Sequence, residues 1–182
     1  MFTSYVKEVI DCAMKINQKD IDKAVMLLDQ ISSTRAGVYI LGNGGSAAIA
    51  SHFAIDLQKS GHVRGKSIRA ISLVDNVSVL TAVSNDIGYE EVFAWQINEL
   101  CDSKDLLITI SSSGNSSNII HALSAASSKG MKTISISGFD GGKASKLANL
   151  SLVAKSEPGK YGLVEDSHAM LCHYISSLLR LK

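Results

Sequence analysis

Five short apolar runs, separated by stretches with helical spacing, are the sequence feature that most constrains this fold. The runs are rich in β-branched residues and lie at residues 38–41, 68–74, 105–110, 133–137 and 150–154. Apolar strands that alternate with helices are typical of a parallel sheet covered on both faces and joined by right-handed crossovers. We therefore expect an α/β fold, a three-layer doubly wound sandwich around a five-stranded parallel sheet.

Helices are predicted between the strands and at both ends of the chain. The internal and final helices are expected at residues 46–60, 77–84, 90–100, 117–129, 143–148 and 164–181. The first thirty-odd residues predict an amphipathic helical arm, with Asp20 as the N-cap of its second part. With one proline and no Gly/Ser-rich linker, the chain predicts a single domain over 1–182, with the arm at 1–34 and the core at 35–182.

Composition excludes several classes of protein. Hydrophobic residues make up 46% of the chain and charged residues 19%, which excludes an intrinsically disordered protein. The 18 Lys and Arg against 17 Asp and Glu give a net charge of +1, which disfavours nucleic acid as a partner. No apolar run reaches the ~20 residues that a membrane span requires. The first residues lack the pattern of a signal peptide, so we expect a cytoplasmic protein.

The three cysteines do not indicate a disulfide framework. Cys12, Cys101 and Cys172 are odd in number and widely spaced, and no C-x-x-C pair exists. This pattern also gives no thiolate zinc site, so we expect the cysteines to be inert core residues.

Two loops at predicted strand ends have the composition of an anion-binding site. The glycine loop (residues 41–46, LGNGGS) and the serine loop (residues 110–117, ISSSGNSS) each precede a predicted helix. Glycines let backbone N–H groups approach an anion, and clustered hydroxyls add donors at a helix N-terminus. Neither loop has the lysine of the G-x-x-x-x-G-K-[ST] nucleotide loop or a typical dinucleotide fingerprint. Together they favour a small phosphorylated ligand over a nucleotide.

The motifs GNGGSAAIASHFAIDL, SNDIGYEEVF, ISSSGNSSNIIHAL and EDSHAMLCHY together resemble the sugar isomerase (SIS) domain family, and within it the phosphoheptose isomerase branch. The resemblance runs from about Gly37 to the C-terminus, and the arm fits it too. It implies a flavodoxin-like SIS fold and conversion of D-sedoheptulose 7-phosphate to D-glycero-D-manno-heptose 7-phosphate, for a bacterial lipopolysaccharide or capsule. It also implies a homotetramer with active sites shared between subunits.

The resemblance carries over site residues one by one. Asn43, Gly45 and Ser46 match the loop that lines the sugar-phosphate site. Asp86 matches an acidic residue that contacts substrate hydroxyls. The phosphate-binding serines are matched by Ser111, Ser112, Ser113 and Ser116.

Two histidines and two carboxylates are candidates for the chemistry. His52 and Asp56 share a helix face, and Glu165 and His173 lie eight apart on neighbouring sides of another helix. An aldose–ketose isomerisation needs groups that take and return a proton, and we expect Asp56 and His173 to do so. Two imidazoles with carboxylates also suit zinc, so all four residues are predicted metal ligands. Glu165 is also predicted to contact the substrate.

At these four positions the family has His, Glu, Gln and His, so this chain departs from it twice. Asp56 is one methylene shorter than glutamate, and Glu165 adds a negative charge where the family has a neutral amide. A third departure is Leu163, near a position where the family often has arginine. A bound ligand is not readily a free base at the same time, so Asp56 has either the metal role or the base role.

Other interpretations stay open. An isomerase of a different sugar phosphate is compatible with the departures at Asp56 and Glu165. A non-catalytic SIS protein that tethers a partner such as a replication initiator is the alternative from another class, but such relatives tend to lose the final histidine, which this chain retains as His173. For His168 and His121 the expected role is that of buried, hydrogen-bonded residues.

Overall fold

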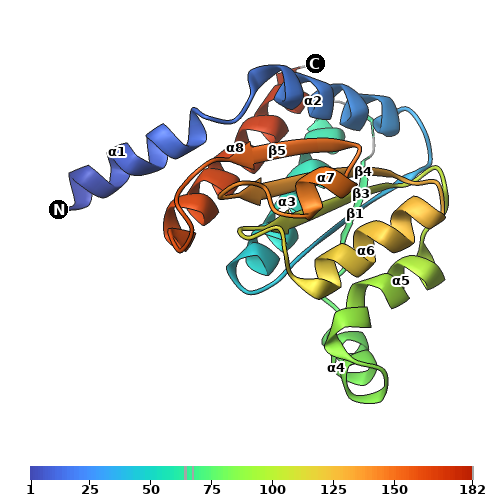
Figure 1. The fold of residues 1–182 in the computed structure, drawn as a ribbon. Helices are drawn as coiled ribbons and strands as arrows, with labels where there is room; N and C mark the ends of the chain where they lie inside the picture. Colours follow the sequence, from blue (N-terminus) through green and yellow to red (C-terminus); the bar gives the residue numbers. More distant parts are fainter. Residues whose placement is uncertain (64, 67, 182) are drawn as a thin grey trace.

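The computed structural model describes residues 1–63, 65–66 and 68–181, so Lys182 of the predicted core lies outside the described residues. The described strands form one parallel sheet in the order β2-β1-β3-β4-β5 (Figure 1). They are β1 (Gly37–Gly42), β2 (Arg69–Ser72), β3 (Leu106–Ser111), β4 (Lys132–Gly138) and β5 (Leu150–Ala154). This is the flavodoxin-like strand order, with its switch point between β1 and β3. The predicted α/β fold with five parallel strands is confirmed.

Helices cover both faces of the sheet. The elements are α1 (Phe2–Ala13), α2 (Gln18–Ser32), α3 (Gly45–Val63), α4 (Val77–Asp86), η1 (Tyr89–Glu91), α5 (Val92–Leu100), α6 (Ser117–Ser128), α7 (Ala144–Leu147) and α8 (Tyr161–Leu181). Residues of α2, α3 and α8 share one apolar cluster, whereas α5, α6 and α7 contribute to the other. The sheet is therefore the middle of three layers, as predicted.

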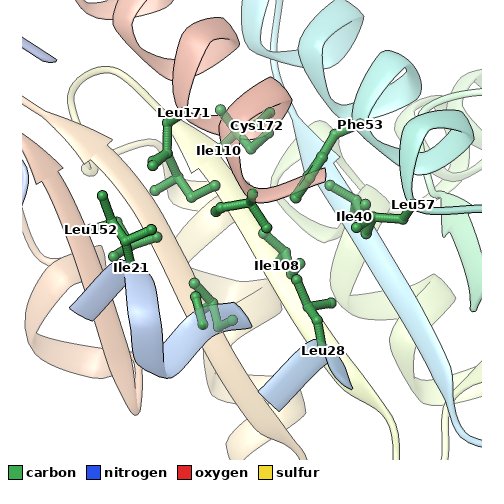
Figure 2. Close-up of a cluster of buried hydrophobic side chains, with 14 of the residues drawn as sticks. Ile21, Leu28, Ile40, Phe53, Leu57, Ile108, Ile110, Leu152, Leu171 and Cys172 are labelled. Carbon is green, nitrogen blue, oxygen red and sulfur yellow. The ribbon is translucent and has the colours of Figure 1, made fainter. Parts of the chain in front are cut away.

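Successive strand residues divide between these two clusters because side chains alternate across a strand. Ile40 of β1 packs with α3 and α8, whereas its neighbours Tyr39 and Leu41 pack on the opposite face. Figure 2 shows the first cluster, in which Phe53 and Leu57 of α3 lie close to Ile40. Burial on both faces explains why the strands read as continuous apolar runs in the sequence.

Besides shifts of one to three residues at the ends of other elements, two elements differ from the prediction. The second strand is shorter than predicted because it lies at the sheet edge, where Arg69 and Ile71 are exposed. The helix predicted at residues 90–100 is divided into η1 and α5, preceded by Gly88 at a φ of 147°. These differences leave the sheet and its order unchanged.

The two N-terminal helices pack differently. Helix α1 extends away from the sheet (Figure 1) and buries only Val9 and Cys12, whereas α2 buries five residues, including Leu28 against the sheet. The N-cap of α2 is Asn17, whose side chain accepts a hydrogen bond from Lys19 N at 2.9 Å. The predicted cap, Asp20, instead lies in the first turn, so that detail was wrong.

Candidate active site

The glycine loop joins β1 to α3 at the carboxyl end of the sheet. Its backbone passes so close to α8 that a Cβ on Gly45 would lie 2.6 Å from Oε2 of Glu165. A larger residue there would require the Glu165 side chain to move, and the contact places the Glu165 carboxylate at the N-terminus of α3, where the helix dipole favours a negative charge. Ser46, in the first turn of α3, is buried. The structure therefore brings Gly45 and Glu165 together at one end of the α3–α8 pair.

Asn43 ties the glycine loop to two other segments. Its Nδ2 donates to Oδ1 of Asn118, and its Oδ1 accepts from Nδ2 of Asn118, both at 2.9 Å. The same Oδ1 accepts from the Tyr89 hydroxyl at 2.9 Å. Asn118 and Tyr89 were not predicted as site residues, although both lie inside the quoted motifs. Asn43 is thus a fixed link between the glycine loop, α6 and η1.

The serine loop folds around its own hydroxyl groups at the N-terminus of α6. Ser111 Oγ accepts from Gly114 N at 3.1 Å, and Ser113 Oγ accepts from Asn115 N at 3.2 Å. Gly114 has a φ of +61°, and a Cβ there would lie 2.2 Å from the carbonyl oxygen of Gly141. The loop is therefore a tight turn of hydroxyls and amides at a helix N-terminus, which suits an anion.

Two further serines complete this loop. The hydroxyl of Ser112 is buried and has no hydrogen-bond partner among the described residues. Ser116 is the N-cap residue of α6, and its side chain makes no capping hydrogen bond. Among the described residues, the Ser112 hydroxyl therefore lacks a hydrogen-bond partner and that of Ser116 does not cap α6.

Asp86 lies apart from these two loops in its contacts. It is the last residue of α4, it is exposed, and it accepts a hydrogen bond from Nδ2 of its neighbour Asn85 at 2.7 Å. Within the described part of the chain, it makes no hydrogen bond to the glycine loop or the serine loop. Its predicted substrate contact stays a prediction.

His52, Asp56 and His173 come together where α3 packs against α8, and we call them the acid–imidazole cluster. Oδ2 of Asp56 lies 3.7 Å from Nε2 of His52 and 3.7 Å from Nε2 of His173. One ligand atom from each residue falls within 4.8 Å of the other two, so the group could hold a metal ion. A cavity of about 20 Å³, lined by these three side chains, lies between the helices. That volume admits one small ligand, such as a water or an ion.

Glu165 is separated from the acid–imidazole cluster in this chain. Helices α3 and α8 run side by side in the same direction, with Gly45 beside Glu165 and the Ser60 hydroxyl bonded to the Ser176 carbonyl. Eight residues of helix rise by about 12 Å, which sets Glu165 that far along the axis from His173. Among the described residues, the group that could hold a metal does not include Glu165.

Two titratable side chains on α8, His168 and Cys172, are buried. His168 is completely buried, and this burial lowers its pKa to about 4, partly opposed by the nearby backbone of Ser137. The predicted burial of His168 is confirmed, whereas neither ring nitrogen has a hydrogen bond of good geometry among the described residues. Burial also raises the pKa of the Cys172 thiol. His121, by contrast, is partly exposed, and its Nδ1 lies 2.7 Å from Oε1 of Glu91.

Comparison with known proteins decides the family. The family model described as SIS domain matches residues 1–138 of this chain. The chain belongs to the SIS domain family. Its similarity to phosphoheptose isomerases extends further, because the enzyme of that name from Helicobacter pylori (strain P12) is 38% identical over 169 residues, 93% of this chain and 87% of the relative.

Solved SIS structures agree with this relationship. The phosphoheptose isomerase from Neisseria gonorrhoeae has a TM-score of 0.87 and 30% identity, covering 100% of this chain and 95% of that one. The structure of a phosphoheptose isomerase from Francisella tularensis gives 0.88 and 27% at the same coverage. This SIS protein is therefore an isomerase of the phosphoheptose isomerase branch. No helix among its described residues is both long and apolar enough to span a bilayer.

Proposed function

We propose that this protein interconverts D-sedoheptulose 7-phosphate and D-glycero-D-manno-heptose 7-phosphate. The observation that carries the proposal is the Asp56 carboxylate set between the imidazoles of His52 and His173, on the two helices that also meet at the glycine loop. A carboxylate between two exposed imidazoles, on the helix pair that meets at the glycine loop, suits proton transfer on a phosphorylated sugar. The phosphoheptose isomerase relatives, which match nearly the whole chain, support the choice of sugar.

The serine loop is the proposed phosphate site. Ser111 and Ser113 shape its turn, Ser116 makes no capping hydrogen bond, and the buried hydroxyl of Ser112 has no partner among the described residues. The N-terminus of α6 adds backbone N–H groups and a favourable dipole for the phosphate. Binding the phosphate here fixes one end of an open sugar chain, and the reacting carbons lie at its other end.

Asp56 and His173 are the proposed proton carriers. In the ketose-to-aldose direction one group removes a proton from C1, which gives an enediolate; a proton is then returned to C2, while the hydroxyl proton moves from the C1 oxygen to the C2 oxygen. The two sugars are isomers, so protons and electrons balance without a redox partner. His173 is 55% and His52 58% exposed, so both imidazoles can exchange protons with water.

His52, Asp56 and His173 are the proposed zinc ligands. Two imidazoles and a carboxylate that converge on a small cavity fit the preferences of zinc. Bound zinc would supply a Lewis acid for the substrate's carbonyl and hydroxyl oxygens. Asp56 then has either the ligand role or the base role, and in the former solvent carries more of the proton transfer. Glu165, beside Gly45, is proposed to contact the substrate, and its metal role stays a prediction.

We further propose a cytoplasmic homotetramer in which residues 1–182 form one domain per subunit. Helix α1 exposes Phe2, Val6, Ile10 and Met14, and a groove of about 410 Å³ between α1, α2 and α8 has an apolar lining. A second subunit would cover this surface. Light scattering of the purified protein tests the assembly, and a monomeric mass under assay conditions would contradict it.

The function is tested by incubating the purified protein with a panel of ketose and aldose phosphates, with and without a metal chelator. We expect conversion of sedoheptulose 7-phosphate and loss of rate after chelation. Conversion of another sugar phosphate alone would favour the isomerase with a different substrate. Failure with every sugar, with zinc supplied, would favour the non-catalytic SIS protein that binds a partner.

A further inference from the structure

The two oxygens of the Asp56 carboxylate face different partners. Oδ2 lies 3.7 Å from the imidazole nitrogen of both histidines, whereas Oδ1 lies 3.9 Å from Nη2 of Arg180. The Asp56 side chain is only 15% exposed, and the guanidinium is 42% exposed. The carboxylate is thus divided between the two imidazoles and one fixed positive charge near the end of α8.

The Arg180 side chain is itself anchored by Ser60. Its Nε donates a hydrogen bond to Oγ of Ser60 at 3.3 Å. Ser60 is completely buried, and its hydroxyl donates to the carbonyl of Asp56 (2.7 Å) or of Ser176 (3.0 Å). The hydroxyl oxygen is therefore fixed between α3 and α8, one turn beyond Asp56. Ser60 therefore anchors one side of the guanidinium, and Nη2 on its other side lies 3.9 Å from Oδ1 of Asp56.

A short carboxylate benefits from such a partner. The last torsion of an aspartate side chain is broad, so a carboxylate without a partner on Oδ1 can rotate away from the imidazoles. A nearby guanidinium restricts that rotation electrostatically and through its planar donors. The family has the longer glutamate at this position, and Asp56 reaches one methylene less far from α3. The same rotation of the carboxylate therefore changes a larger fraction of the distance over which the Asp56 side chain extends toward the reacting atoms.

We propose that Arg180 is a positioning residue, held by Ser60, which fixes Oδ1 of Asp56 so that Oδ2 faces His52 and His173. This proposal rests on the proposed role of Asp56 in the isomerase. A partly exposed ion pair at 3.9 Å adds little to folding stability. Its effect is therefore on the rate of turnover, with little effect on stability or on substrate binding.

The test compares Arg180→Ala and Arg180→Lys with Arg35→Ala, which removes an equally charged, exposed side chain from the segment between α2 and β1. We measure kcat and KM separately, together with thermal unfolding. Misplacement of a reacting group costs up to about a hundredfold in rate, so for Arg180→Ala we expect kcat to fall about tenfold with KM within about twofold. Arg180→Lys keeps the charge without the Nε donor and should recover part of the loss. Added guanidinium at low concentration should raise kcat for Arg180→Ala and leave Arg35→Ala unchanged.

Three results would overturn the proposal. One is a wild-type kcat in Arg180→Ala; another is a rise in KM alone, which would assign Arg180 to substrate binding. The third is an equal loss in Arg180→Lys with no response to guanidinium, which would mean a purely structural role. Asp56→Ala is measured alongside: if it remains active, the proposed role of Asp56 fails, whereas an inactive Asp56→Ala with a fully active Arg180→Ala rejects only the positioning role.

Discussion

The anion-binding loops and the acid–imidazole cluster lie on the same core but are held in different ways. In the loops, Asn43 makes hydrogen bonds of 2.9 Å to Asn118 and Tyr89, and Ser111 closes its own turn at 3.1 Å. In the cluster, the imidazoles of His52 and His173 lie 3.7 Å from Asp56 and are more than half exposed. The folded chain alone thus fixes the loops of the proposed phosphate site, whereas the side chains of the cluster keep room for a ligand between them.

The largest expected effect on turnover comes from a change in the acid–imidazole cluster. Replacing His173 by alanine should abolish turnover, because general acid–base groups contribute about a hundredfold to ten-thousandfold in rate. Since the side chain is 55% exposed, thermal unfolding should change little. The matched control is His62→Ala, an exposed histidine in the last turn of α3, which should keep full activity. Full activity in His173→Ala would remove His173 from the mechanism.

The second prediction concerns the serine loop. Gly114→Ala would force an L-residue to a φ of +61° and place its Cβ 2.2 Å from the Gly141 carbonyl oxygen. Strain and overlap together should cost about 3 kcal/mol of unfolding free energy and raise KM. Gly159→Ala has a similar φ of +91° but open space around its Cβ. This control should cost only about 1 kcal/mol, from the backbone alone. Equal losses in the two variants would mean that the tight turn is not needed.

The third prediction is that the free energy of unfolding depends on pH because of His168, which is buried on α8. Burial lowers the pKa of His168 from 6.5 to about 4, so between these values the unfolded chain binds a proton that the folded chain does not. Stability from this group is complete above pH 6.5 and declines as pH falls, with a loss of about 2 kcal/mol by pH 5. Urea unfolding of the native protein and of His168→Leu at pH 7 and pH 5 measures it. If the unfolding free energy of His168→Leu falls between pH 7 and pH 5 as much as that of the native protein, the acid sensitivity originates from other groups.

The smallest expected effect concerns the link between the loops. Tyr89→Phe removes one of the three hydrogen bonds that the Asn43 side chain makes among the described residues, and leaves the ring in place. We expect a loss of about 1 kcal/mol in stability and a modest rise in KM. Asn118→Leu removes both amide hydrogen bonds and should raise KM further. If the two variants bind substrate as well as the native protein does, Asn43 is not a link that matters for binding.

The strands and helices were largely predictable from the sequence because burial on both faces of the sheet leaves continuous apolar runs. The N-cap of α2 could not be predicted, because Asn and Asp are equally good N-cap residues. Only the hydrogen bond from Lys19 N identifies Asn17 rather than Asp20 as the cap. The division of the helix at residues 90–100 was missed because the change of backbone direction comes before it, at Gly88.

The site was predictable only in part. His52 and Asp56 are four apart on one helix, so their proximity follows from helical spacing. Glu165 and His173 share a face of α8, as their spacing in the sequence predicts. A shared face does not bring them together, however, because eight residues rise by about 12 Å along the helix axis. The contacts of Asn118, Tyr89 and Arg180 join segments far apart in the chain, and no local pattern predicts them.

The most direct test of the central claim is proton NMR of sedoheptulose 7-phosphate with the purified protein in heavy water. The exposed imidazole of His173 should exchange the transferred proton with solvent before it returns to carbon. We predict heptose 7-phosphate that carries deuterium at C2. Absence of conversion with zinc supplied, or a product that keeps only protium at C2, would contradict proton transfer by the acid–imidazole cluster.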